Sequence, residues 1–95
     1  MEAPAWYAAW WERTEECSGL TGDFEAIDWY IIPGQTFELD GAEWVGHWIQ
    51  NVGIVIAGLY RNHEVVVRHE MLHELLGAEG HPPEFDECRL TWETQ

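Results

Sequence analysis

Lysine is absent from this chain of 95 residues, and its only fixed positive charges are four arginines. Aspartate and glutamate together number 18, which gives a formal net charge of −14. Such a surface repels phosphate backbones, so the composition argues against nucleic acid as a partner. Two interpretations of the acidity stay open. It keeps the protein soluble, or it favours a basic substrate.

Long apolar runs are also lacking. No run approaches the roughly 20 residues that cross a bilayer, so no membrane partner is expected. No basic stretch followed by an apolar stretch opens the chain, so an exported protein would already have lost its signal peptide. Internal repeats and low-complexity segments are missing too. Residues 1–95 are therefore predicted to form one domain, expected as a monomer.

Cysteine is scarce, with Cys17 and Cys88 lying near opposite ends of the chain. A disulfide between them would close most of the fold and stabilise it by about 4 kcal/mol in the loop-entropy treatment. It would also imply an oxidising compartment, so a secreted or periplasmic protein is predicted. Two alternatives remain. The cysteines could be buried free thiols of a cytosolic protein, or Cys88 could bind a metal.

Apolar residues are plentiful, with 46% of the chain and seven tryptophans available for a core. The spacing of Trp6, Ala9, Trp10 and Arg13 predicts a helix over Ala3–Cys17. Period-two patterns and apolar runs then predict strands, and Asp40-Gly41 is a hairpin-turn signal. The predicted strands are Ile27–Ile32, Thr36–Leu39, Glu43–Ile49 and a central one within Val52–Tyr60.

A long helix is predicted from His63 to Leu76, with Asn62 as its N-cap and Gly77 after its last turn. Apolar residues lie nearly all round this helix, so it should be the buried spine of the domain. A short helical turn is expected at Glu84–Cys88. The predicted fold class is α+β, with an N-terminal helix, a small twisted mixed sheet of three to four strands, a central helix and a short C-terminal segment.

The central helix carries an HExxH motif, His69-Glu70-Met71-Leu72-His73. Histidines four residues apart share a helix face, so both rings can bind one Zn²⁺ ion. Glu70 lies about 100° round the helix from His69 and is predicted to be the catalytic base that acts on a zinc-bound water. A zinc ion would also satisfy two polar rings within an apolar helix.

A catalytic zinc site needs a third protein ligand, and His81 is the predicted one. Gly77 ends the helix and Gly80 lets the chain turn back toward the motif. The nearby carboxylates are alternative ligands: Glu84, Asp86 and Glu87. His47 is expected to be an ordinary surface residue, and its alternative role is to stabilise a developing oxyanion, for which Tyr30 and Tyr60 are equally weak candidates. His63 is expected to be solvated.

The segment from Val66 to His73 resembles the active-site helix of the zincin metallopeptidases. The third His of the metzincin branch comes earlier after the motif than His81 does here. Gly80-His81-Pro82-Pro83-Glu84-Phe85 is closer to the Gly-His-Gly-Pro-Glu-Phe pattern of the SprT/Spartan-type proteases. That likeness spans Val65–Cys88 and implies His81 as zinc ligand and Phe85 as an anchor of the loop. The spacer is shorter here and the basic DNA-binding parts are absent, so the DNA-repair role is not implied.

The resemblance also implies a minimal zincin-like fold. In zincins the strand at the sheet edge pairs with extended substrate, which would assign Glu43–Ile49 to the edge and Val52–Ala57 to a place inside it. The chain is not expected to contain the larger lower subdomain that usually forms the other wall of the cleft. That departure bears on catalytic efficiency more than on zinc binding.

Three functional hypotheses follow. The first is a zinc metalloendopeptidase that hydrolyses peptide bonds in a peptide or protein substrate. The second is a binding module of low or no activity in which zinc has a structural role. The third is an acidic, tryptophan-rich interaction protein without a metal.

Overall fold

The computed structural model describes residues 2–91, and helices and strands follow one another there in the order expected of a small α+β fold. The α-helices are α1 (Ala5–Ser18), α2 (Glu64–Leu76) and α3 (Glu84–Glu87). The strands are β1 (Trp29–Ile32), β2 (Phe37–Leu39), β3 (Ala42–Trp44), β4 (Gly46–Ile49) and β5 (Gly53–Ala57). Single 3₁₀ turns lie at η1 (Phe24–Ala26) and η2 (Gly58–Tyr60).

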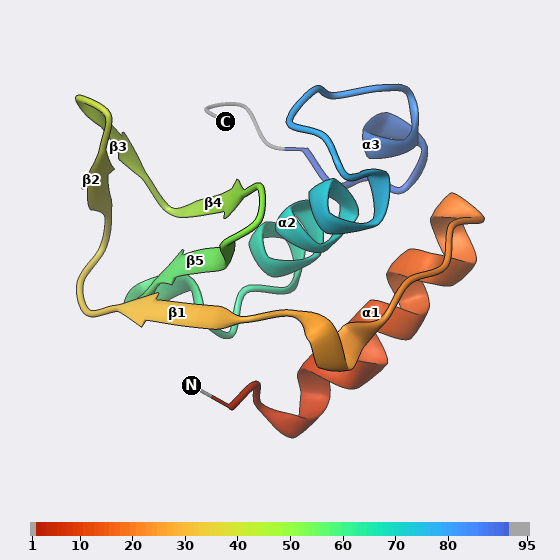
Figure 1. Cartoon of the computed structure of the whole chain (residues 1–95), viewed down its shortest axis with the longest axis horizontal. Coiled ribbons are helices and arrows are strands. Elements are labelled where there is room, and N and C mark those ends of the chain that lie inside the picture. Colours follow the sequence, from red (N-terminus) through yellow and green to blue (C-terminus); the bar gives the residue numbers. More distant parts are fainter. Residues whose placement is uncertain (1, 92–95) are drawn as a thin grey trace.

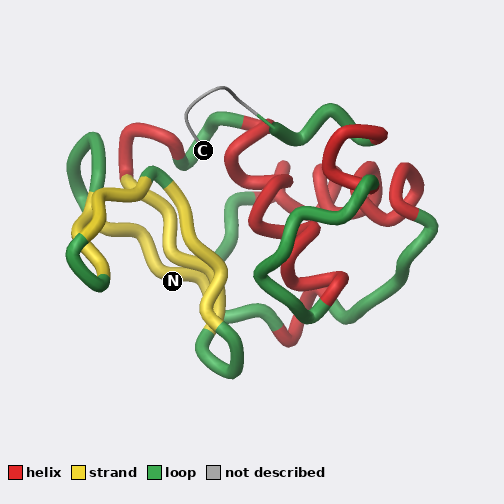
Figure 2. Tube along the Cα trace, turned by 90° about the horizontal axis from the view of Figure 1, so that it is seen from above, coloured by secondary structure: helices red, strands yellow, loops and turns green. Residues whose placement is uncertain are grey.

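The main sheet is mixed, as predicted, with the strand order β1-β5-β4. β5 is buried along its whole length, pairs in parallel with β1 and pairs antiparallel with β4. The strands gather on one side of the molecule and the α-helices on the other (Figure 2). α2 packs against β4 and β5, and α1 packs against α2 (Figure 1). The predicted order is confirmed, since β4 lies at the sheet edge and β5 lies inside.

The prediction of one strand over Glu43–Ile49 is wrong, because the chain changes sheets at Val45. Trp44 pairs with Phe37 in the β2–β3 hairpin, whereas Gly46 pairs with Ile56 in the main sheet. The alternation of side chains is interrupted there, and the rings of Trp44 and His47 lie 4.4 Å apart between centroids. The predicted strand is divided in two because β3 pairs with β2, whereas β4 pairs with β5.

The hairpin itself follows from its turn residues. Asp40 and Gly41 both have positive φ values, of 53° and 81°, as a tight turn with the twist of a hairpin requires. β2 and β3 pair antiparallel across this turn. The hairpin projects from the main sheet (Figure 1). Glu43 and Trp44 of β3 line the cavity described below.

The main core lies between α1, α2 and the main sheet, and tryptophan supplies much of it. Trp11, Trp29 and Trp48 are buried there, and Trp10 is packed against them. Trp6 is the exposed exception among the tryptophans of residues 2–91, at 48% of its surface. Most tryptophans in this part of the chain therefore serve the core, which weakens the hypothesis of a tryptophan-rich binding patch.

Both ends of α2 are fixed by local contacts. The predicted N-cap Asn62 is wrong. His63 occupies that position, and its Nδ1 accepts the backbone N–H of Val66 at 3.3 Å. An imidazole nitrogen can serve there because it is an acceptor near the first free N–H groups. Gly77 ends the helix in the left-handed conformation, with φ 67°, as predicted.

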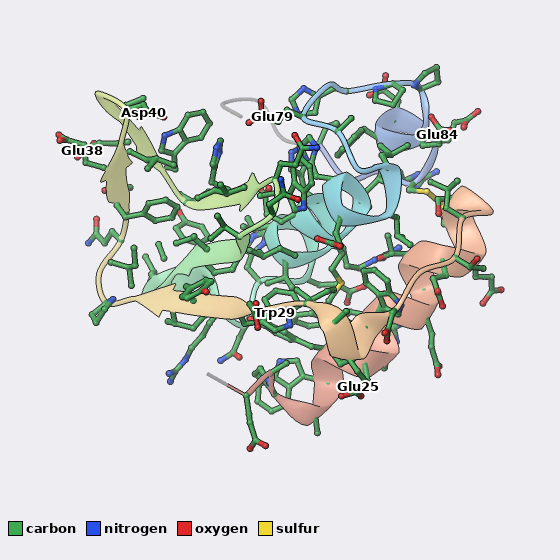
Figure 3. All side chains as sticks on the ribbon, viewed as in Figure 1. Glu25, Trp29, Glu38, Asp40, Glu79 and Glu84 are labelled. Atoms are coloured by element: carbon green, nitrogen blue, oxygen red, sulfur yellow. A yellow bond between two sulfur atoms is a disulfide. The ribbon has the colours of Figure 1, made fainter. Side chains whose placement is uncertain are left out.

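The disulfide between Cys17 and Cys88 is confirmed. It joins the last turn of α1 to the residue after α3 across 71 positions of sequence, and its sulfur atoms are visible at the right of Figure 3. Neither cysteine is a free thiol or a metal ligand. A disulfide fits an oxidising compartment such as the extracellular space or the periplasm. None of the helices within residues 2–91 has the length and apolar character needed to cross a bilayer.

Candidate metal centre

Three histidines converge beside the C-terminal half of α2. His69 and His73 lie one helical turn apart, and His81 comes from the loop between α2 and α3. The Nε2 atom of His69 lies 3.3 Å from Nε2 of His73 and 3.3 Å from Nε2 of His81. Their ligand atoms all lie within 4.8 Å of one another, so the three side chains could hold a metal ion. The predicted grouping of these residues is thus present.

The carboxylates weighed as third ligands do not join this group. Among residues 2–91, the His/Cys/Asp/Glu cluster with metal-binding geometry contains the three histidines alone. Glu84, which Figure 3 labels, lies on α3 and is not part of this cluster. The left-handed turn at Gly77 directs the chain back over the helix end and brings His81 to the histidines of α2.

Backbone carbonyls fix the orientation of both helical histidines. The Nδ1 of His69 donates to the carbonyl oxygen of Leu90 at 2.6 Å, and that of His73 donates to Ala78 at 2.9 Å. A carbonyl oxygen only accepts, so Nδ1 carries the proton and Nε2 keeps its lone pair in each neutral ring. No hydrogen bond can then join the facing Nε2 atoms of His69 and His73. The two Nε2 lone pairs repel each other, whereas a cation bound between them would attract both.

Burial keeps these two rings neutral. It lowers the pKa of His69 to about 4, opposed in part by the carbonyl of Leu90. It also lowers the pKa of His73, opposed in part by the carbonyl of Ala78. Since a metal binds the neutral imidazole, the two ligands are already in the binding form at neutral pH.

Phe85 forms an apolar support for all three rings. Its ring centroid lies 4.7 Å from those of His69 and His73 and 4.9 Å from that of His81. Its side chain is 1% exposed. The contact limits how far each imidazole can tilt, in line with the anchoring role that the family resemblance implies.

Glu70 lines the same cavity and is itself buried, at 3% exposure. Burial raises the pKa of its carboxyl to about 8, and a hydrogen bond from the backbone N–H of Trp48 opposes part of that rise. A dication bound nearby would also favour the carboxylate. Gly46 makes room for this side chain, because a Cβ there would lie 3.2 Å from both Cγ and Oε2 of Glu70. A glycine inside a strand pattern is the signal that could have indicated such a close approach.

The edge strand presents backbone groups to the cavity. The carbonyl of Val45, the residue before β4, accepts the N–H of Ala57 in β5 at 2.9 Å, so these two residues form a hydrogen-bonded pair that continues the β4–β5 ladder. In an antiparallel ladder the alternate residues then direct their N–H and C=O groups away from the partner strand. Those residues are Gly46 and Trp48, next to Glu70. The bond from Trp48 to Glu70 agrees with this direction.

The cavity has a volume of about 570 Å³ and extends from the histidines to the β2–β3 hairpin. His47 lies on its wall with Nε2 3.8 Å from a carboxylate oxygen of Glu79. Tyr30 and Tyr60, the other oxyanion candidates, are not among its lining residues. His63 is exposed at the far end of α2, as expected. The lining residues toward the hairpin are Thr36, Glu43, Trp44, Val45, His47 and Glu79.

Comparison of the chain with models of known protein families, with curated proteins and with solved structures finds no match. The assignment of a function therefore depends on the geometry and chemistry of this cavity.

Proposed function

We propose that the protein is a zinc-dependent endopeptidase. The observation that carries the proposal is the convergence of three histidine Nε2 atoms, 3.3 Å apart along two edges, in one cavity with Glu70. Tetrahedral coordination by nitrogen at about 2.0–2.1 Å places neighbouring nitrogens roughly 3.3–3.4 Å apart, so these separations fit zinc. Three ligands leave a fourth position open, as in catalytic zinc sites.

Zinc in such a site polarises a carbonyl oxygen and makes water more acidic. Glu70 supplies the base. Its carboxylate, at the cavity wall, takes a proton from the attacking water and later delivers it to the leaving amine. The backbone N–H of Trp48 holds the carboxylate in place, and the space above Gly46 keeps it free of a neighbouring side chain. The surrounding apolar core limits access of bulk water to this proton.

The substrate in this proposal is an extended peptide that adds to the open edge of β4. The outward groups of Gly46 and the carbonyl of Trp48 are suited to bind a peptide backbone by strand addition. This places the scissile bond over the histidines and Glu70, which line the same cavity. The disulfide supports action in a secreted or periplasmic setting.

A second candidate function is a binding module with a structural zinc. The observation in its favour is that two of the histidines lie on α2 and the third lies in the loop before α3. An ion bound to all three would cross-link these two parts of the small fold. This function predicts that chelation destabilises the domain while no peptide is cut.

The two functions are separated by zinc content and cleavage measured on one preparation. The peptidase proposal expects one zinc per chain and hydrolysis of extended peptides that stops on chelation and returns when zinc is restored. Stoichiometric zinc with a chelator-sensitive melting temperature but no cleavage of a diverse peptide library supports the binding module. A protein without zinc affinity contradicts both.

The charge of the cavity mouth favours basic side chains in the substrate. Glu43 and Glu79 are exposed and line the cavity, and none of the four arginines lines it. Exposed ion pairs contribute about 0.2–1 kcal/mol each. We therefore expect the double substitution Glu43→Gln/Glu79→Gln, which removes two such pairs, to lower kcat/KM for arginine-containing peptides about two- to thirtyfold, with little change for leucine-containing ones.

A matched control removes the same charge elsewhere. Glu12 and Glu16 are exposed on α1, and neither lines the cavity. Glu12→Gln/Glu16→Gln should leave the preference for arginine over leucine unchanged. An equal loss in both double variants would assign the preference to net charge rather than to the cavity.

A further inference from the structure

The last described part of the chain, Phe85–Leu90, contacts the metal centre although it supplies no ligand to it. The Leu90 carbonyl accepts the Nδ1–H of His69, and the Phe85 ring supports all three histidines. Both side chains are 1% exposed, and they pack with Leu72 and Cys88 in a separate apolar cluster. This segment therefore sets where the three imidazoles lie.

The segment has a tight internal geometry. The N–H of Leu90 donates to the carbonyl of Phe85 at 2.9 Å, and Arg89 between them has a φ of 56°. The left-handed residue turns the chain so that the Leu90 carbonyl reaches His69. A change of φ at Arg89 would rotate that carbonyl away, because the two residues are adjacent.

The disulfide ties this segment to α1. Cys88 lies three residues after Phe85 and two before Leu90, and its partner Cys17 lies in the last turn of α1. α3 is a helix of four residues, too short to hold its own conformation in water. The covalent link to a long helix thus restrains the part of the chain that orients His69.

We infer that Phe85–Leu90 is a positioning segment whose hold on the histidines depends on the Cys17–Cys88 disulfide, so that the oxidised protein binds the metal more tightly. The inference rests on the proposed metal site. Residues that orient a metal ligand typically change affinity about 10- to 100-fold when they are lost. Loss of the disulfide is expected to raise the zinc dissociation constant by the same factor.

The first test compares the full chain with its Cys17→Ser/Cys88→Ser variant. Zinc affinity is measured by competition with a chromophoric chelator, and the visible spectrum of bound Co²⁺ reports the tetrahedral geometry of the ligands. The double variant is used in place of a thiol reductant, because thiols bind zinc themselves. Tyr7→Phe serves as a stability control, because it removes the partly buried hydrogen bond from Tyr7, at the end of α1 away from Cys17, to the Arg61 carbonyl. Its zinc affinity should not change.

The second test leaves both cysteines in place, so it applies even if the double variant does not fold. Arg89→Pro forces φ to about −65° and turns the Leu90 carbonyl away, whereas Arg89→Gly keeps the left-handed conformation accessible. We expect a 10- to 100-fold weaker zinc affinity and an altered Co²⁺ spectrum for the proline variant, with near-normal values for the glycine variant.

The outcomes separate this inference from the proposed function. If the oxidised wild-type protein binds no zinc, both are overturned. If it binds zinc and the folded cysteine variant, or the proline variant, binds it within twofold of the wild-type affinity, only the inference is overturned. A loss in those variants that the Tyr7→Phe and Arg89→Gly controls do not share supports it.

Discussion

Replacing Glu70 with glutamine is expected to slow peptide hydrolysis by about 100- to 10,000-fold, the usual range for loss of a general base. Glutamine has nearly the same shape, so it can still accept the Trp48 N–H, but its amide cannot take a proton from water. The ligand atoms of the three histidines are untouched. Zinc stoichiometry should therefore stay at one per chain while kcat falls. The measurement is single-substrate kinetics on a quenched fluorescent peptide, with zinc content determined on the same sample.

The control for this variant is Glu74→Gln on the same helix. Glu74 accepts the indole N–H of Trp48 at 2.8 Å and does not line the metal cavity, and a glutamine oxygen can accept the same bond. Its activity should stay close to that of the wild-type protein. Full activity in Glu70→Gln would rule out Glu70 as the base, and equal losses in both variants would indicate a structural effect.

Removal of His81 is expected to weaken zinc binding by more than about 100-fold, beyond the range seen when a residue only orients a ligand. His81→Ala leaves only His69 and His73 of the three proposed ligands. Two ligands do not fix a tetrahedral site. His81 is exposed, so its replacement leaves no core cavity and the apo protein should keep its melting temperature. Chelator competition gives the affinity, and thermal unfolding with and without zinc gives the accompanying loss of stabilisation.

Glu84→Gln is the matched control for His81→Ala, because Glu84 was the nearest carboxylate alternative on the same stretch of chain. It should bind zinc with wild-type affinity. The reverse result, tight binding in His81→Ala and weak binding in Glu84→Gln, would mean that the loop rearranges on metal binding so that a carboxylate ligates.

The central helix and its ligands could be predicted from sequence because each has a local signature. The spacing of His69 and His73 is fixed by the helix, and Gly77 marks where the helix must end. The edge position of β4 and the inner position of β5 were predicted through the family resemblance, and the pairing agrees. The disulfide was favoured because two cysteines near opposite ends of a small chain would stabilise it.

Other features depend on tertiary contacts that leave little trace in sequence. The carbonyl of Leu90 orients His69 through its backbone, and any residue has a carbonyl. The break at Val45 follows from two competing partner strands, and a period-two pattern continues across it. His63 replaces Asn62 as N-cap, although asparagine is the better cap, because the chain enters the helix one residue later.

The close approach of Gly46 to Glu70 has a consequence for sequence variation. A Cβ at position 46 would lie 3.2 Å from Cγ and Oε2 of Glu70 and from Cδ1 of Ile56, so a larger residue there requires these side chains to shift by a few tenths of an ångström. The two positions are 24 residues apart in sequence and belong to different elements, but the Glu70 side chain occupies space that a side chain at position 46 would need. In an aligned set of relatives we expect them to change together, with larger residues at position 46 appearing only in chains that have lost the acid at position 70.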